Sequence, residues 1–421
     1  MEYFTKKINL FLILLLTLFL LFFSIHKNIA LFSDYTEYVD ILDQSADSDF
    51  PYGINFQIHF TSEKNIEDVK IVFLVGNRST SQYSYMDLSK ANNKIFAEHF
   101  FNSGSINNFI PPSAKISYFY EFIFDDNSSY VSEDFLFFYH DNRFKWQEII
   151  TEKSNIFFYD ISVDLAKAIS NISDQTITKM SKLLDVKIGN TINLVIYNNK
   201  DDMHSAVTHK SKTSSEKLTI LGQAFSEEKI VIVLLDEQVF ETVNHEITHI
   251  ISSIATDNSD FFPLWLNEGL SEYSDITPQK YVSILKWGIE EENLLPLKQL
   301  NTFPGDPKKT ILAYGQSQSV VRYLIDNYGQ KNIANLFQRI RKIKSYSAID
   351  TEFTNVYGFN LDQLYSSWKD NLYQELGIES PKNRSLIDKL FIRKNYYIIL
   401  SFLVSTLVVL ILFRLAKKTS S

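Results

Sequence analysis

The residues with the clearest chemical potential are the two histidines and the glutamate of His245-Glu246-Ile247-Thr248-His249. Apolar residues recur at steps of three and four from 237 to 255, which predicts a helix. Residues four apart lie on one face of a helix, so the two imidazoles can bind one ion. The neighbouring carboxylate of Glu246 can then take a proton from a water molecule that the metal activates. The alternative is a solvated helix face with two unrelated histidines.

A second motif follows, with the sequence W-L-N-E-G-L-S-E-Y from Trp265 to Tyr273. Eighteen residues separate His249 from Glu268, enough to end the first helix, turn over 257–263 and begin an antiparallel helix. Glu268 would then face the two histidines. A catalytic zinc takes three protein ligands and keeps one open position. The spacing therefore predicts a Zn2+ site whose ligands are His245, His249 and Glu268, with Glu246 as the general base.

Glu272 lies one helical turn after Glu268. A histidine that binds a metal usually donates its outer N–H to an acceptor, and Glu272 is a candidate for that acceptor. The alternative is a solvated surface glutamate.

Together the two motifs resemble the gluzincin metallopeptidases, specifically the peptidase MA-like family, which is related to aminopeptidase N and more remotely to thermolysin. The resemblance is tight over about 239–275 and looser over 313–329. It implies a peptide or protein substrate and the same ligands and base. Tyr314 matches the tyrosine that donates to the oxyanion in relatives of aminopeptidase N, although a tyrosine of the core is the alternative.

The segment 221–225 resembles the edge strand that lies beside the zinc in gluzincins. In aminopeptidases the corresponding motif carries a glutamate that binds the free amine of the substrate. This chain has Gly222 but no glutamate before Glu227. The resemblance therefore does not imply an aminopeptidase.

The spacing of apolar residues changes near residue 146, well before these motifs. Residues 33–142 alternate between apolar and polar with turn residues between short runs, which predicts an all-β sandwich of immunoglobulin-like type. Residues 146–376 predict an α+β gluzincin metallopeptidase domain, followed by a linker over 377–394. Within that domain we expect a helix at 158–184, strands at 192–197 and 230–235, and a polar loop at 201–215.

Two segments, 8–25 and 395–413, have the length and apolar character of membrane helices, although a signal peptide is the alternative for 8–25. Lysines and arginines at both outer flanks place both termini in the cytoplasm. The predicted fold class is therefore multidomain, with a membrane helix at each end of a sandwich and a peptidase domain. The predicted localisation is the cell membrane, with the catalytic region extracytoplasmic.

Composition narrows the possible functions of the 421 residues. A net charge of −9 argues against binding to nucleic acid, which needs a basic face. The absence of cysteine leaves only histidine and carboxylate ligands for a zinc site. The sequence predicts a membrane-anchored zinc metallopeptidase. Two alternatives remain open: a catalytically silent adhesion or scaffold protein, and a zinc hydrolase whose substrate is not a peptide. The sequence gives no oligomeric state.

Overall fold

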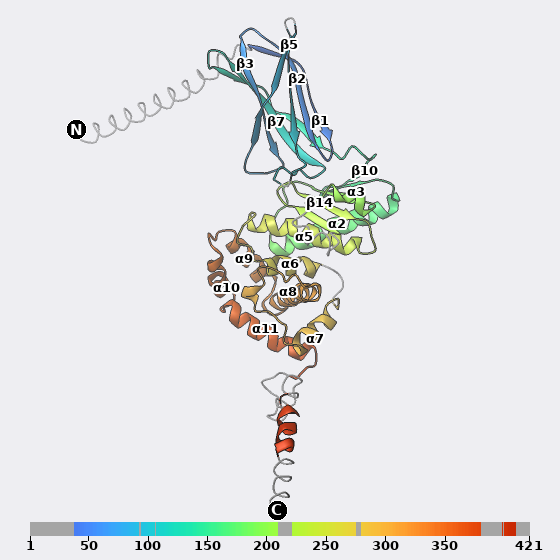
Figure 1. Cartoon of the computed structure of the whole chain (residues 1–421), viewed down its shortest axis with the longest axis vertical. Coiled ribbons are helices and arrows are strands. Elements are labelled where there is room, and N and C mark those ends of the chain that lie inside the picture. Colours follow the sequence, from blue (N-terminus) through green and yellow to red (C-terminus); the bar gives the residue numbers. More distant parts are fainter. Residues whose placement is uncertain are drawn as a thin grey trace, which may run out of the picture. The chain divides into compact units, whose positions relative to one another are not determined.

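The computed structural model describes residues 38–91, 94–105, 107–208, 221–274, 279–379, 398 and 400–409. It divides the chain into two compact units, with the boundary between Arg143 and Phe144 (Figure 1).

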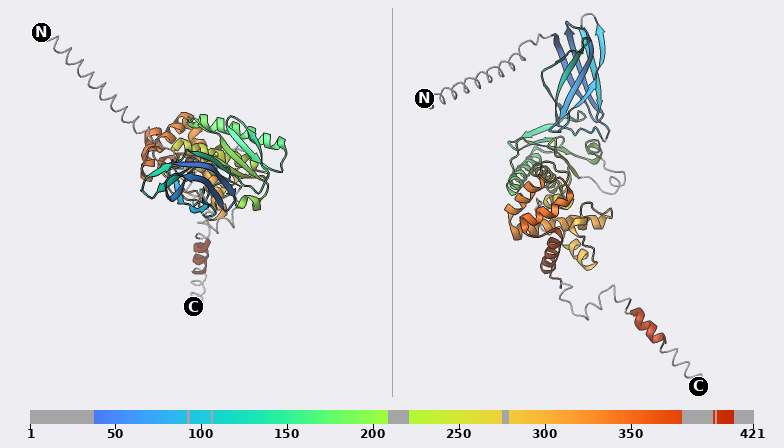
Figure 2. Two further views of the ribbon diagram at one scale, coloured as in Figure 1. Left: turned by 90° about the horizontal axis from the view of Figure 1, so that it is seen from above. Right: turned by 90° about the vertical axis from the view of Figure 1, so that its left-hand side faces the viewer.

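Two antiparallel sheets form the first unit, and the right-hand view of Figure 2 shows its strands running alongside one another. One sheet has the strand order β1-β2-β6-β5. The other has the order β4-β3-β7-β8, and β9 also pairs with β7. The bounds are β1 (Val39–Asp49), β2 (Gly53–Ser62), β3 (Ile66–Val75), β4 (Gln82–Tyr85), β5 (Asp87–Ala91), β6 (Lys94–Asn102), β7 (Ala114–Phe124), β8 (Ser129–Val131) and β9 (Phe135–Tyr139).

Aromatic side chains fill the space between these two sheets. Alternate residues of a strand point to opposite faces, and the apolar set of each central strand points inward. Phe56 of β2 lies 5.5 Å from Phe73 of β3, measured between ring centroids. Phe60 of β2 lies 4.8 Å from Phe122 of β7. These cross-sheet contacts show that the first unit is a β-sandwich with its own core.

Another sheet, with five strands, forms the framework of the second unit. Its order is β10-β11-β12-β14-β13. The three central strands are parallel to one another, and the two outer strands are antiparallel to their neighbours. The strand β13 is thus an edge of the sheet. The bounds are β10 (Gln147–Ile150), β11 (Ser154–Phe158), β12 (Ile192–Tyr197), β13 (Gly222–Phe225) and β14 (Ile230–Leu234).

The helices α2, α3 and α5 contact this sheet, and α5 lies between it and the helices α6 and α9 (Figure 1). The helix α5 contacts β13 and β14 on one side, and α2, α6 and α9 elsewhere. The bounds are α2 (Val163–Leu184), α3 (Lys200–His204), α5 (Val239–Thr256), α6 (Leu264–Ser274), α7 (Val282–Glu290), η1 (Leu297–Gln299), α8 (Pro307–Tyr328), α9 (Gln330–Ile340), η2 (Tyr346–Ala348), α10 (Ile349–Tyr357) and α11 (Leu361–Glu375). The position of α5 in the middle means that both layers can contribute residues to a site on it.

The predicted membrane helix at each end is wrong. Among the residues that the structure describes, no helix is long and apolar enough to cross a membrane. The segment 8–25 lies outside the described residues. Of 395–413, only residues 398 and 400–409 are described.

One local expectation also changes. Part of the predicted loop 201–215 is the short helix α3, which begins after Asn199. The side chain of Asn199 accepts a hydrogen bond from the backbone N–H of Asp202, and this cap satisfies a free donor of the first turn. Residues 209–220 lie outside the described residues.

Glycine permits unusually close packing of α6 against α8. A Cβ atom added at Gly269 would lie 2.4 Å from the backbone oxygen of Ser317, closer than non-bonded atoms approach. The side-chain amide of Gln318 donates to the backbone oxygen of Glu272 at 2.9 Å, which also joins the two helices. The position of α6 therefore depends on a residue without a side chain at 269.

We predict that Gly269→Ala destabilises the protein by about 1–3 kcal/mol, because the added methyl group meets backbone that cannot rotate away. Urea unfolding measures this change in the free energy of unfolding. Gly305→Ala is the matched control, since nothing lies within 4 Å of a Cβ there. Equal stability of the two variants would contradict the close packing.

Candidate metal centre

The apolar pattern of α5 fixes which of its residues face the site. Its buried side chains include Val243, Ile247, Ile250 and Ile251, which belong to the core of the second unit. The histidines at 245 and 249 therefore point away from that core toward α6 and β13. The helix ends at Asp257, which adopts a left-handed conformation with φ 56° and lets the chain turn back.

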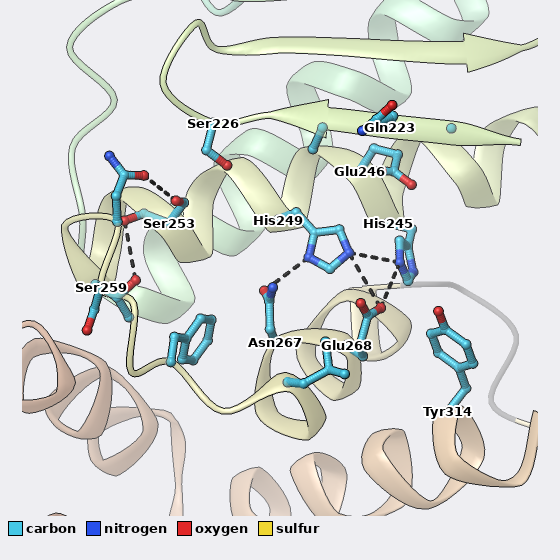
Figure 3. A pocket seen from close by; sticks show the side chains of 16 residues that line it. Gln223, Ser226, His245, Glu246, His249, Ser253, Ser259, Asn267, Glu268 and Tyr314 are labelled. Atoms are coloured by element: carbon cyan, nitrogen blue, oxygen red, sulfur yellow. Dashed lines mark hydrogen bonds and ion pairs between the residues drawn. The ribbon is translucent and has the colours of Figure 1, made fainter. Parts of the chain in front are cut away.

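The next helix, α6, brings Glu268 to the two histidines (Figure 3). One ligand atom from each of His245, His249 and Glu268 lies within 4.8 Å of the others. The two imidazole Nε2 atoms are 3.0 Å apart. Oε2 of Glu268 lies 3.3 Å from Nε2 of His245 and 3.5 Å from Nε2 of His249. The three atoms thus form a nearly equilateral triangle.

The outer nitrogens of both rings meet hydrogen-bond acceptors. Nδ1 of His249 lies 3.0 Å from the amide oxygen of Asn267 and 3.1 Å from the hydroxyl of Ser271. Nδ1 of His245 lies 3.3 Å from a carboxylate oxygen of Glu272. An amide or carboxylate oxygen only accepts, so these contacts assign the proton to Nδ1 in each ring. Both Nε2 atoms then carry lone pairs that point at each other.

This arrangement fits a metal ion. In a tetrahedral zinc site with bonds of about 2.0–2.2 Å, ligand atoms are about 3.3 Å apart, which matches the three separations. Oε2 of Glu268 is buried and has no hydrogen-bond donor. A buried acceptor beside two lone pairs is costly unless a cation joins the group. His245, His249 and Glu268 are therefore the residues that would hold the ion.

The electrostatics of the site also favour a cation. Burial opposes charge on His245, but the nearby carboxylates of Glu268 and Glu272 outweigh burial and raise its pKa well above the usual value. Burial would raise the pKa of Glu268, yet the charge of His249 and the contacts with His245 hold it well below its usual range. For Glu272, burial is likewise outweighed by His245 and Lys280, which lower the pKa to about 2. The carboxylates are thus ionised and attract either protons or a metal.

Glu246 lies between the two histidines and the edge strand. Burial raises the pKa of its carboxyl group, while nearby charges on the histidines oppose this shift. The backbone N–H of Ala224 in β13 donates to the carboxylate. A Cβ atom at Gly222 would lie 2.7 Å from Cγ of Glu246. Only glycine at 222 therefore lets β13 approach this side chain so closely.

Tyr314 comes from α8 and lines the same pocket, with its hydroxyl pointing toward the cluster (Figure 3). Its ring packs edge-on against Phe303, with centroids 4.9 Å apart. Burial, with help from the carboxylates of the site, raises the pKa of its hydroxyl far above the usual value. The group therefore stays protonated and can donate a hydrogen bond.

The cluster opens into a pocket with a volume of about 490 Å³. Its walls come from β13, from α5 and the turn after it, and from α6 and α8. All of the predicted site residues line this pocket except Glu272, which lies behind His245 and contacts Lys280 at 3.1 Å.

Three contributors were not predicted. Asn267 directly precedes Glu268, Ser271 follows it by three residues, and Lys280 contacts Glu272. The only signal for the first two was their place in the same motif. The helical spacing puts Ser271 on the face of Glu268, so it could have been proposed as a partner of a ligand histidine.

Comparisons with known proteins agree with this geometry. A family model for the Peptidase MA superfamily matches residues 172–374, the range that contains every residue of the site. This part of the chain is therefore similar to the Peptidase MA superfamily. No match was found among curated proteins.

Solved structures give weaker likenesses. An aminopeptidase N family protein from Idiomarina loihiensis is 10% identical over 84% of this chain and 77% of that one, with a TM-score of 0.31. A carbohydrate-binding module family 56 β-1,3-glucan binding domain is 22% identical over 23% of this chain and 95% of its own, with a TM-score of 0.15. A GH family 64 laminaripentaose-producing β-1,3-glucanase from Paenibacillus barengoltzii is 20% identical over 30% of this chain and 23% of that one, with a TM-score of 0.16. TM-scores this low do not define a shared fold.

We predict that Glu272→Ala weakens the affinity for Zn2+ by about 10–100-fold, because Nδ1 of His245 loses the acceptor that fixes its ring. Competition with a chromophoric chelator measures this affinity. Glu290→Ala, an exposed glutamate on α7, serves as the control and should leave the affinity unchanged. An unchanged affinity in the Glu272 variant would show that this contact does not orient the ligand.

Proposed function

We propose that the protein is a zinc metallopeptidase that hydrolyses peptide bonds, with Glu246 as the general base. One observation carries the proposal. Two imidazole lone pairs and a buried carboxylate converge at one point, and a second carboxylate stands beside them in an open pocket. Similarity of the region to the Peptidase MA superfamily supports it.

A bound zinc ion supplies Lewis-acid chemistry, which makes a water molecule more acidic and polarises a carbonyl group. Glu246 takes the proton from the attacking water and passes it to the leaving amine. A raised pKa suits this role, because an efficient general base has a pKa near the working pH. The hydrogen bond from Ala224 holds the carboxylate toward the pocket.

The other parts of the pocket bind and stabilise the reacting chain. The hydroxyl of Tyr314 donates to the oxygen that gains negative charge during attack. The strand β13 borders the pocket at the edge of the sheet, so an extended peptide can add to it through main-chain hydrogen bonds. This arrangement favours a polypeptide over a compact small molecule as the substrate.

A catalytically silent scaffold is the competing function. Such a protein has no need for a general base, whereas Glu246 is present and lies half-buried beside the cluster. Incubation of the full chain with a peptide library, with products identified by mass spectrometry, tests the proposal. Cleavage supports a peptidase, and a zinc-loaded protein that cleaves no peptide would support the scaffold.

We predict that Glu246→Gln lowers kcat by about 10²–10⁴-fold or more, because the amide cannot accept the proton. Zinc content should stay at about one ion per chain, since Glu246 is not among the three converging ligands. Elemental analysis and the cleavage assay are run on the same sample. Full activity of this variant would rule out Glu246 as the base.

We predict that Tyr314→Phe lowers kcat by on the order of 10²-fold, less than Glu246→Gln does, and leaves KM nearly unchanged. The hydroxyl acts on charge that develops only in the transition state. Tyr357→Phe is the control, because that buried hydroxyl has no hydrogen-bond partner and lies on α10, away from the pocket lining. A rise in KM with an unchanged kcat would assign Tyr314 to substrate binding instead.

A further inference from the structure

The pocket continues past the metal centre toward the C-terminal end of α5 (Figure 3). We name this extension the polar arm and define it by five of the lining residues: Ser226, Ser253, Asn258, Ser259 and Phe262. Ser226 follows the edge strand β13, Ser253 lies on α5, and the other three come from the turn between α5 and α6.

The polar arm is within reach of a substrate held at the metal centre. Ser253 is four residues after His249 on one helix, which corresponds to a displacement of about 6 Å. An extended peptide advances about 3.3 Å per residue. The side chain of a residue next to the scissile bond, or one further along, therefore reaches the polar arm.

The lining of the polar arm is neutral. Among the described residues that line the pocket, the titratable ones are the two histidines and two glutamates of the metal centre and Tyr314, which stays neutral. Asp257 and Asp260 are exposed nearby but do not line it, and Asp257 pairs with Arg341 at 3.2 Å. A charged group that entered the polar arm would lose hydration without gaining a counter-charge.

The polar arm is also built to bind. The hydroxyl of Ser253 donates to the amide oxygen of Asn258, and Oγ of Ser259 accepts from the backbone N–H of Phe261 at 3.3 Å. These contacts hold hydroxyl and amide groups at the wall. Phe262 closes the arm with an apolar surface, and its ring is held edge-on against Phe337 at 5.0 Å.

We propose that the polar arm is a specificity subsite that selects an uncharged side chain of the substrate near the scissile bond. The proposal deepens the peptidase function and rests on it. Hydroxyl and amide groups bind neutral polar side chains, and Phe262 contacts their aliphatic part. Lysine, arginine, aspartate and glutamate are disfavoured at this one substrate position, because no lining group compensates their charge.

The test installs a charge in the polar arm. Asn258→Asp changes one amide to a carboxylate of the same shape at an exposed turn residue, and Ser253→Asp places a carboxylate on the neighbouring residue of α5. A peptide library randomised around the scissile bond is cleaved by each full-length variant, and kcat/KM is ranked at each position. Ser367→Asp, an exposed serine on α11, is the control for added charge.

We expect the wild type to prefer uncharged residues over charged ones by about tenfold at one position. Both polar-arm variants should shift preference toward lysine and arginine at that same position by about tenfold, and Ser367→Asp should not. A wild type that prefers a charged residue at every position, or polar-arm variants that keep the wild-type ranking, would overturn the subsite.

A binding measurement separates this proposal from the proposed function. The zinc-loaded Glu246→Gln protein, with and without Asn258→Asp, is used to capture peptides from the same library. A shift of the captured peptides toward basic residues supports the subsite even if the wild type cleaves nothing, in which case only the peptidase function fails. Identical captured sets would overturn the subsite independently of hydrolysis.

Discussion

Two imidazole nitrogens 3.0 Å apart, each with its lone pair directed at the other, are the constraint on which the rest of the second unit depends. Such a pair is repulsive in a buried setting unless a cation lies between the nitrogens and Glu268. Asn267 and Glu272 accept from the outer N–H of each ring, so the repulsion between the inner nitrogens is relieved only by a proton or a metal ion. The free energy of folding of the second unit is thus coupled to metal binding, because the ion binds the folded ligand set.

The packing around α5 keeps these groups together. Its apolar side is buried in the core, its other side meets β13 and α6, and each of these two neighbours is packed through a glycine. Gly222 allows the edge strand to contact Glu246, and Gly269 allows α6 to lie against the backbone of α8. Sites built on helices and strands hold their geometry better than sites on loops. The turn after α5 provides part of the polar arm, namely Asn258, Ser259 and Phe262, and none of these three is a ligand of the predicted metal site.

Sequence alone predicts part of this arrangement. The convergence of His245, His249 and Glu268 follows from helical spacing and from a gap long enough for one turn, although their role as ligands stays a prediction. The contact between Asn267 and His249 does not follow from spacing, because it depends on how α6 is rotated about its axis. The close approach of Gly269 to Ser317 joins residues far apart in the chain, and no local pattern encodes it.

Two further predictions failed or changed for identifiable reasons. The expected loop after Asn199 contains α3, because one side-chain cap was enough to start a helical turn among polar residues. The expected membrane helices were inferred from the length, apolar character and basic flanks of two segments, and no helix among the described residues is long and apolar enough to cross a membrane. The domain limits and the localisation stay predictions.

X-ray absorption at the zinc K-edge of the zinc-loaded full-length protein tests the central claim most directly. The account predicts one zinc environment with nitrogen and oxygen neighbours at about 2.0–2.2 Å, multiple scattering from two imidazole rings, and loss of one ring in His249→Ala. A spectrum without imidazole scattering, or one that His249→Ala leaves unchanged, would contradict the convergence of these lone pairs on one ion.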